Sequence, residues 1–177
     1  MIEWQAGKSV AALLLGAALL VVPAGPAAAA PVKLALFDFE LEDFSAAASA
    51  GAVAPADVEK MARVTNEVRQ LFQSSGRYRL VDVGTADAAP AKAHALRDCD
   101  GCDAPIALKL GAEQSFVGVV RRISRMEYIV RFQVRDARTG AVVADANSGL
   151  RMGADDSWSR GAVRLIKDRL LAGQMQQ

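Results

Sequence analysis

The sequence is short of the side chains on which most enzymes and cofactor proteins depend. Its 177 residues include one histidine and two cysteines, and aromatic residues make up only 6%. It has no excess of one charge either, because 21 Lys and Arg face 20 Asp and Glu, which excludes a polybasic nucleic-acid binder. Charged residues nevertheless make up 23%, so the chain is neither a multi-span membrane protein nor a disordered tail.

Familiar catalytic signatures are missing as well. The sequence contains no G-x-S-x-G, H-E-x-x-H or G-x-x-x-x-G-K motif. A Ser-His-Asp or Cys-His mechanism would have to use His94, which lies in an alanine-rich segment typical of a surface. We therefore expect no catalytic residues and no cofactor.

One long apolar run lies near the amino terminus. Residues 10–22 carry no charge, follow Lys8, and precede two prolines and four alanines. This order is typical of a secretory signal peptide, and the run's 13 residues are fewer than the roughly 20 that span a bilayer. We expect residues 1–30 to be removed on export, which leaves residues 31–177 in the periplasm, or secreted, without a stable membrane anchor. Because Glu3 offsets Lys8, an uncleaved anchor is the alternative.

Hydrophobic periodicity predicts the elements of the mature part. Residues 32–40 indicate a strand with Leu34, Leu36 and Asp38 on one face and Ala35, Phe37 and Phe39 on the other. A helix then begins at Pro55, with Val58, Met61, Val64, Val68, Leu71 and Phe72 as its apolar face, and ends at Gly76. Later segments predict strands at 78–83, 116–123, 128–135 and 141–150, a short helix at 104–110 capped by Asp103, and a last helix that includes Trp158.

This order predicts one mixed α/β domain over residues 31–177. It begins as β-α-β and ends with a β-meander, so we expect a mixed sheet of about five strands with helices packed on it. Segments 45–53 and 84–95 are expected to be flexible loops. For the alanine-rich segment 84–95, a weak helix is the alternative.

Charge is distributed unevenly along this domain. Residues 31–113 carry 9 basic and 13 acidic side chains, whereas residues 114–154 carry 7 and 3. Ordinary solvated faces would explain the difference, and so would a basic sheet surface that meets an anionic partner.

The two cysteines form the only motif with possible chemistry, Cys99-Asp100-Gly101-Cys102. After export such a pair most often becomes a disulfide. A redox-active pair needs a stabilised thiolate, which Asp98, Asp100 and Asp103 disfavour, with Arg97 as the one nearby opposing charge. Metal binding by His94, Cys99 and Cys102 is the remaining alternative, whereas Asp103 stands where attached haem needs histidine.

Two further groups are candidates for binding. Asp38 and Glu40 end the first predicted strand, where open α/β sheets commonly bind ligands, although an acidic solvated strand end is the simpler interpretation. Trp158, on an amphipathic helix, is expected to anchor the core and only secondarily an interface, together with Asp156 and Arg160.

Several segments carry a family resemblance: LALFDFELED, SSGRYRLVDV, CDGC, LGAEQSFVGVVRRIS, VRDARTGAVV and DDSWSRGAVRLIKDRLL. Together they resemble a family of uncharacterised secreted proteobacterial proteins, of the domain-of-unknown-function type numbered two-three-eight-zero or three-two-eight-zero. More loosely, the chain is similar to the TolB amino-terminal domain and to the periplasmic domain of the curli-secretion lipoprotein. The resemblance implies an α/β envelope module that recruits protein partners without catalysis. The sequence departs from those relatives because it has no lipid-anchor cysteine and no propeller, so the resemblance does not imply their established roles.

We therefore expect a non-catalytic periplasmic accessory protein that binds an envelope or secreted protein through an exposed sheet edge or the basic meander. The alternative is a thiol-disulfide or metal-handling protein that uses Cys99 and Cys102. A small-ligand site at the strand end, near Asp38 and Glu40, is a third possibility.

Overall fold

A computed structural model describes residues 1, 30–45, 54–85, 88–93, 95–154 and 157–172. The elements are β1 (Val32–Leu36), β2 (Glu40–Asp43), α1 (Pro55–Ser74), β3 (Tyr78–Leu80), α2 (Ala89–Ala93), η3 (Leu96–Asp98), α3 (Asp103–Lys109), β4 (Gln114–Arg122), β5 (Glu127–Asp136), β6 (Val142–Asn147), β7 (Arg151–Met152), α4 (Trp158–Ile166) and η5 (Lys167–Leu171). The predicted signal peptide lies outside these residues except at its two ends.

The strands form one mixed sheet, which confirms the predicted fold class. Its order is β3-β1-β4-β5-β6, while β2 pairs with β4 and β7 pairs with β5. β1 is parallel to β3 and β4, whereas β4, β5 and β6 form the predicted antiparallel meander. Parallel pairing in the first half and hairpins in the second follow from the order of helices and strands along the chain.

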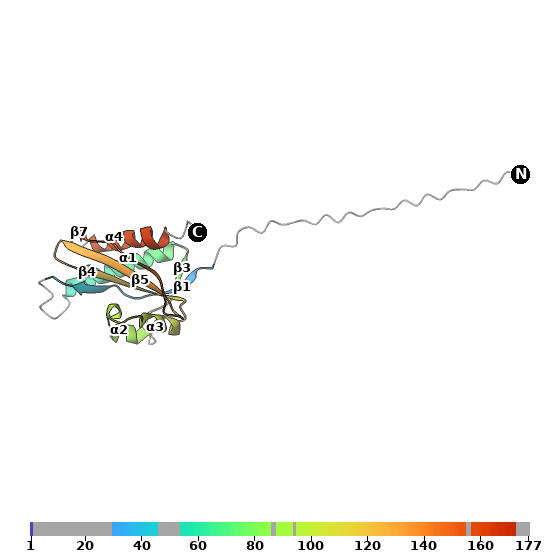
Figure 1. The fold of residues 1–177 in the computed structure, drawn as a ribbon, viewed down its shortest axis with the longest axis horizontal. Coiled ribbons are helices and arrows are strands. Elements are labelled where there is room, and N and C mark those ends of the chain that lie inside the picture. The colour runs from blue at the N-terminus through green and yellow to red at the C-terminus, as the bar shows by residue number, and fades with distance from the viewer. Residues whose placement is uncertain (2–29, 46–53, 86–87, 94, 155–156, 173–177) are drawn as a thin grey trace.

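Helices cover both faces of this sheet (Figure 1). α1 and α4 lie over one face, while α2 and α3 lie over the other. The larger core, under α1 and α4, contains Phe72, Phe116, Phe132 and Trp158. The smaller core, under η3 and α3, is built mainly from alanine and short aliphatic side chains, with Phe37 as its one aromatic residue among those described. The two aliphatic faces of β1 belong to different cores, as expected for a strand inside a sheet.

The first predicted strand is interrupted. Leu36 pairs with Phe116, but Glu40 pairs with Val119, so β1 and β2 contain one residue more than the β4 segment they follow. Such a bulge reverses the alternation of side chains beyond it. Phe39 therefore enters the larger core with Leu36, and not the face of Phe37 as predicted.

Three other local expectations, on Val58, on Asp103 and on the end of β3, were wrong. Val58 is 57% exposed, because only the part of α1 facing the sheet is covered. Asp103 is the first residue of α3 and not its cap, and its carboxylate accepts a hydrogen bond from Ser115 of β4, the strand on which α3 packs. Within 84–95, the alanine-rich segment contains the short helix α2, which agrees with the weak helix expected there as the alternative to a loop. β3 ends at Leu80, three residues early, and the Asp82 carboxylate accepts the backbone N–H of Gly84 at 2.7 Å in the turn that follows.

Much of the basic surplus of the meander is neutralised within the chain. β2 runs beside the end of β4, which sets Glu42 opposite Arg121 and Asp43 opposite Arg122. Glu42 lies 2.7 Å from Arg121 and Asp43 2.5 Å from Arg122. The acidic first half and the basic second half of the domain are thus in part complementary surfaces of one sheet.

Candidate functional site

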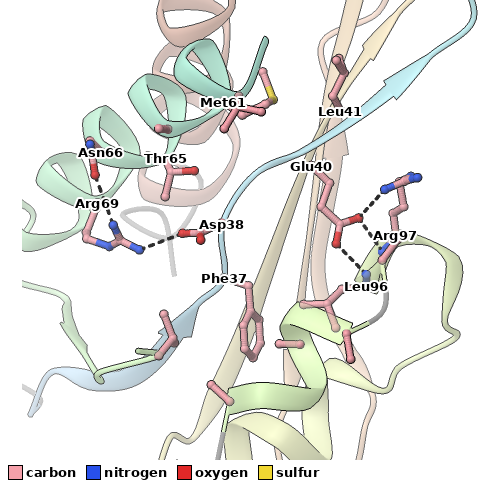
Figure 2. A pocket seen from close by; sticks show the side chains of 17 residues that line it. Phe37, Asp38, Glu40, Leu41, Met61, Thr65, Asn66, Arg69, Leu96 and Arg97 are labelled. Carbon is pink, nitrogen blue, oxygen red and sulfur yellow. Dashed lines mark hydrogen bonds and ion pairs between the residues drawn. The ribbon is translucent and has the colours of Figure 1, made fainter. Parts of the chain in front are cut away.

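A cleft of about 650 Å³ opens where the bulge interrupts the edge of the sheet. One wall is α1 and the other is formed by α2 and η3, so the two helical layers approach each other there (Figure 2). The bulge frees the backbone N–H of Phe39, which donates a 2.9 Å hydrogen bond to Thr65 Oγ1 of α1. The cleft lies where the chain stops pairing with β4 after Leu36 and pairs with it again from Glu40, with one residue more than β4 has over the same stretch.

Glu40, predicted at this strand end, holds the opposite wall in place. Its carboxylate accepts the backbone N–H groups of Leu96 at 2.6 Å and Arg97 at 3.0 Å, and lies 3.1 Å from the Arg97 guanidinium. These N–H groups begin η3 and would otherwise lack partners at a helix start. Glu40 thereby joins the sheet to the cysteine segment.

Asp38 lies on the same cleft but turns toward α1. Its carboxylate is 74% exposed and lies 3.3 Å from Arg69 (Figure 2). Each predicted carboxylate thus has its own arginine on its own wall, and the two do not converge as an acid-base pair would. With Met61, Leu41 and other apolar side chains between them, the cleft is suited to enclosing an apolar group between two ion pairs.

The cysteine segment lies on the α3 face of the sheet. The sulfur atoms of Cys99 and Cys102 are within disulfide distance, and their Cα atoms are 5.7 Å apart, in the usual range for a bridge. Gly101 has φ 88°, a conformation that side chains rarely adopt, and this allows the tight loop.

Sequence reasoning missed the main cation of this loop. Arg97 is engaged by Glu40 and by Asp98 at 3.4 Å, whereas Arg135 of β5 lies 3.1 Å from Asp100 and 3.7 Å from Asp103. An added Cβ at Gly101 would be 3.4 Å from the Arg135 guanidinium, so glycine also allows this close approach. Only the meander register brings Arg135 to the cysteines, and no local pattern marks it.

We expect the exported protein to carry the pair as a stable bridge. Intact mass after alkylation without reductant should show no alkyl groups, and after denaturation and reduction it should show two. Replacing both cysteines with alanine should lower the free energy of unfolding by about 2 kcal/mol or less, because the loop is short. Alkylation of the native protein before reduction, or metal retained through a desalting column, would instead support the thiol or metal alternative.

Trp158 is a core residue, as its position on an amphipathic helix indicated. It is 1% exposed and lies under two cations, with Lys60 at 5.7 Å and Arg122 at 5.6 Å from its ring centroid. Its side chain is therefore almost fully covered in this structure, and the secondary role at an interface stays a prediction.

Arg122 is the centre of a buried ionic cluster that the sequence did not reveal. Its guanidinium contacts Asp43 of β2 at 2.5 Å and Asp57 of α1 at 2.8 Å. Hydrogen bonds from Arg122 lower the pKa of Asp43 to about 2 and also lower the pKa of Asp57, while the two carboxylates raise the pKa of Arg122. The cluster joins β2, β4 and α1 through ion pairs, and it joins α4 through the Trp158 ring. This is an architectural role.

The remaining predicted residues separate. Arg160 is exposed on α4, near a groove beside β7. Asp156 and His94 lie outside the described residues, so the metal alternative stays a prediction. Within the described ranges, no three His, Cys, Asp or Glu side chains cluster as metal ligands. None of the helices described there has the length and apolar character to cross a membrane.

These features define a class of protein: a single mixed α/β domain with two helical layers, a cleft at a bulged strand and a cysteine loop. The chain belongs to the family described as "Protein of unknown function (DUF2380)", whose model matches residues 32–170. This confirms the resemblance to a domain-of-unknown-function family. No curated protein matches the chain.

Several solved structures are similar to this chain at low sequence identity. The LpoB C-terminal domain from Salmonella enterica is 14% identical with a TM-score of 0.50, and the match covers 72% of this chain and 87% of that one. The PelC dodecamer from Paraburkholderia phytofirmans is 21% identical with a TM-score of 0.43, covering 86% and 94%. Lipoprotein GNA1162 from Neisseria meningitidis is 13% identical with a TM-score of 0.42, covering 70% and 82%. At 14% identity, the match to the LpoB C-terminal domain shows the fold alone and nothing about activity.

Proposed function

We propose that the mature chain is a non-catalytic accessory domain of the periplasm that binds an envelope or secreted protein by strand addition at β6. The amino-terminal signal sequence supports export, and the fold shared with the LpoB C-terminal domain agrees with a small stand-alone module. The observation that carries the proposal is the free outer edge of β6.

β6 pairs with β5 and, among the described elements, with no strand on its other side. The Ser148 N–H donates to Val130 O at 2.8 Å, and bonded pairs alternate along an antiparallel ladder. With Ala146 opposite Phe132 and Ala144 opposite Val134, the backbone groups of Asp145 and Asn147 point away from the sheet. An incoming extended chain can pair with these groups.

The start of β6 also offers apolar contact. Val142 and Val143 both lie opposite Arg135, because a bulge inserts one residue in β6, and they are 43% and 49% exposed. Bulges commonly blunt an edge against unselective pairing. The bulge therefore leaves only residues 144–147 for regular pairing, which favours a short and selective partner strand.

A site-specific crosslink tests this edge directly. With a photoreactive phenylalanine analogue at Val143 in an exporting host, we expect one discrete crosslinked product. The same analogue at exposed Arg63 on α1 should give none. Asp145→Pro should abolish the product, since proline removes an outward N–H but no bond to β5. Asp145→Ala, the matched control, keeps that N–H and should retain the product.

Circular dichroism and thermal unfolding should show that Asp145→Pro leaves the fold intact. A crosslink that survives Asp145→Pro, or equal products at positions 143 and 63, would contradict strand addition. The same preparation submitted to intact-mass analysis separates this proposal from the thiol or metal alternative centred on Cys99 and Cys102.

A further inference from the structure

A second groove, of about 530 Å³, runs between α4 and the end of the meander. Arg160 and Arg164 of α4, Arg169 of η5 and Arg151 of β7 line it, and we call it the arginine groove. Asn147 and Ser148, at the end of β6, form part of the same lining. The groove is therefore continuous with the edge to which the proposed partner strand adds.

Compared with the bulge cleft and the depression beside the cysteines, the arginine groove has a clear surplus of positive charge. Asp168 is its single carboxylate and lies 3.6 Å from Arg164, and both side chains are mostly exposed. The bulge cleft balances two acids with two arginines, and the depression beside the cysteines has more carboxylates than arginines. Asp155 and Asp156, which precede α4 in the sequence, lie outside the described residues.

The surplus of positive charge in the arginine groove lowers the stability of α4. Arg160 and Arg164 are four residues apart and share one helix face, where like charges destabilise a helix. Gly161 between them is required by packing, because an added Cβ would be 2.9 Å from the Tyr128 hydroxyl. Tyr128 lines the same groove as the two arginines, and its hydroxyl lies 3.4 Å from Ser157 O.

We propose that the arginine groove binds the carboxylates of an acidic extended segment in the same protein partner that pairs with β6. Guanidinium groups recognise carboxylates through paired, directional hydrogen bonds. Arg160 and Arg164 are separated by about 6 Å of helix rise, and alternate side chains of a strand by about 6.6 Å. Because these two spacings are similar, a strand that extends from the β6 edge with acidic residues at alternate positions can place one carboxylate near each arginine. This inference rests on the proposed function, since it identifies the chemistry of the partner.

The first test uses a defined probe with the mature protein. A fluorescent peptide of about 12 alternating Glu and Thr residues is compared with one of equal composition whose glutamates are contiguous. We expect tighter binding of the alternating peptide. Arg160→Glu with Arg164→Glu should weaken it about tenfold or more, and added salt should reduce the difference. Arg63→Glu with Arg138→Glu, two exposed arginines elsewhere, should change affinity less than about twofold for the same change in net charge.

Equal weakening by both double variants would overturn the inference, because it would show attraction by net charge alone. The inference would also be overturned if Arg160→Glu with Arg164→Glu abolished binding to phosphatidylglycerol vesicles but left peptide binding unchanged. That result would indicate that the groove binds a lipid surface.

The crosslink at Val143 separates the two proposals. A product that disappears with Arg160→Glu and Arg164→Glu but not with the control pair supports the inference. A product unaffected by either pair overturns the inference and leaves strand addition standing, whereas no product in the wild type overturns the proposed function and this inference with it.

Discussion

Replacing Arg122 with methionine is expected to lower the free energy of unfolding by about 3–5 kcal/mol. The side chain is buried, and its guanidinium is the shared partner of Asp43 and Asp57. Methionine fills similar space but removes the main partner of both carboxylates, leaving Asp57 with Lys60 at 3.3 Å and Asp43 with the Ser45 N–H at 2.9 Å. Urea unfolding of the mature domain at neutral pH, followed by circular dichroism, measures the change.

The adjacent Arg121 is a matched control. It is also an arginine at the end of β4 and contacts an acid of β2, Glu42, at 2.7 Å, but 36% of its side chain is exposed. Exposed ion pairs contribute about 0–1 kcal/mol, so Arg121→Met should have a small effect. Equal losses at the two positions would contradict the buried cluster.

Low pH should remove the stabilisation that the ion pairs of Arg122 with Asp43 and Asp57 contribute. The pKa of Asp43 is about 2 in the folded protein, against an ordinary value of 3.8, and the pKa of Asp57 is lowered as well. A carboxyl with a depressed folded pKa stabilises fully above its unfolded pKa and loses that contribution as pH falls toward its folded pKa. The stability gap between wild type and Arg122→Met should therefore be largest above pH of about 4 and shrink toward about 2. A gap that stays constant over this range would exclude the two carboxylates as its source.

The ionic cluster illustrates where sequence reasoning ends. The uneven charge along the domain was visible, and so were the acids of residues 40–43 and the two adjacent arginines. What could not be read was that β2 lies parallel to the end of β4, since this register depends on the bulge between β1 and β2. The sequence suggested that the basic meander could meet an anionic partner. In the structure, acids of β2 in the same chain pair with two of its arginines, Arg121 and Arg122.

The meander and the long helix were predictable because their patterns are local. Tyr128, Val130, Phe132 and Val134 alternate with exposed or half-buried neighbours, and all four are buried. Gly140, with φ 72°, closes the hairpin as its position indicated. The candidate sites were less predictable. Asp38 and Glu40 do line a cleft, but the arginines that engage them come from α1 and η3, at distances along the chain that no spacing rule covers.

The bulge itself should be detectable as an energetic coupling between Phe39 and Gly118. Phe39→Ala is expected to destabilise the domain by about 3–5 kcal/mol, because the ring is buried in the larger core against Phe116. Gly118→Ala should destabilise it by about 1–3 kcal/mol, since an added Cβ would collide with the Phe39 ring.

The double variant should be less destabilised than the sum of the two single variants, by about 1 kcal/mol or more, because removing the ring makes room for the new methyl group. Urea unfolding of the four proteins completes the cycle. The coupling depends on the face that Phe39 occupies. On an uninterrupted strand over residues 32–40 its ring would lie with Phe37 in the smaller core, far from the position of Gly118, and the two substitutions would be additive. Additive free energies would therefore contradict the bulge, and with it the origin of the cleft between α1 and η3.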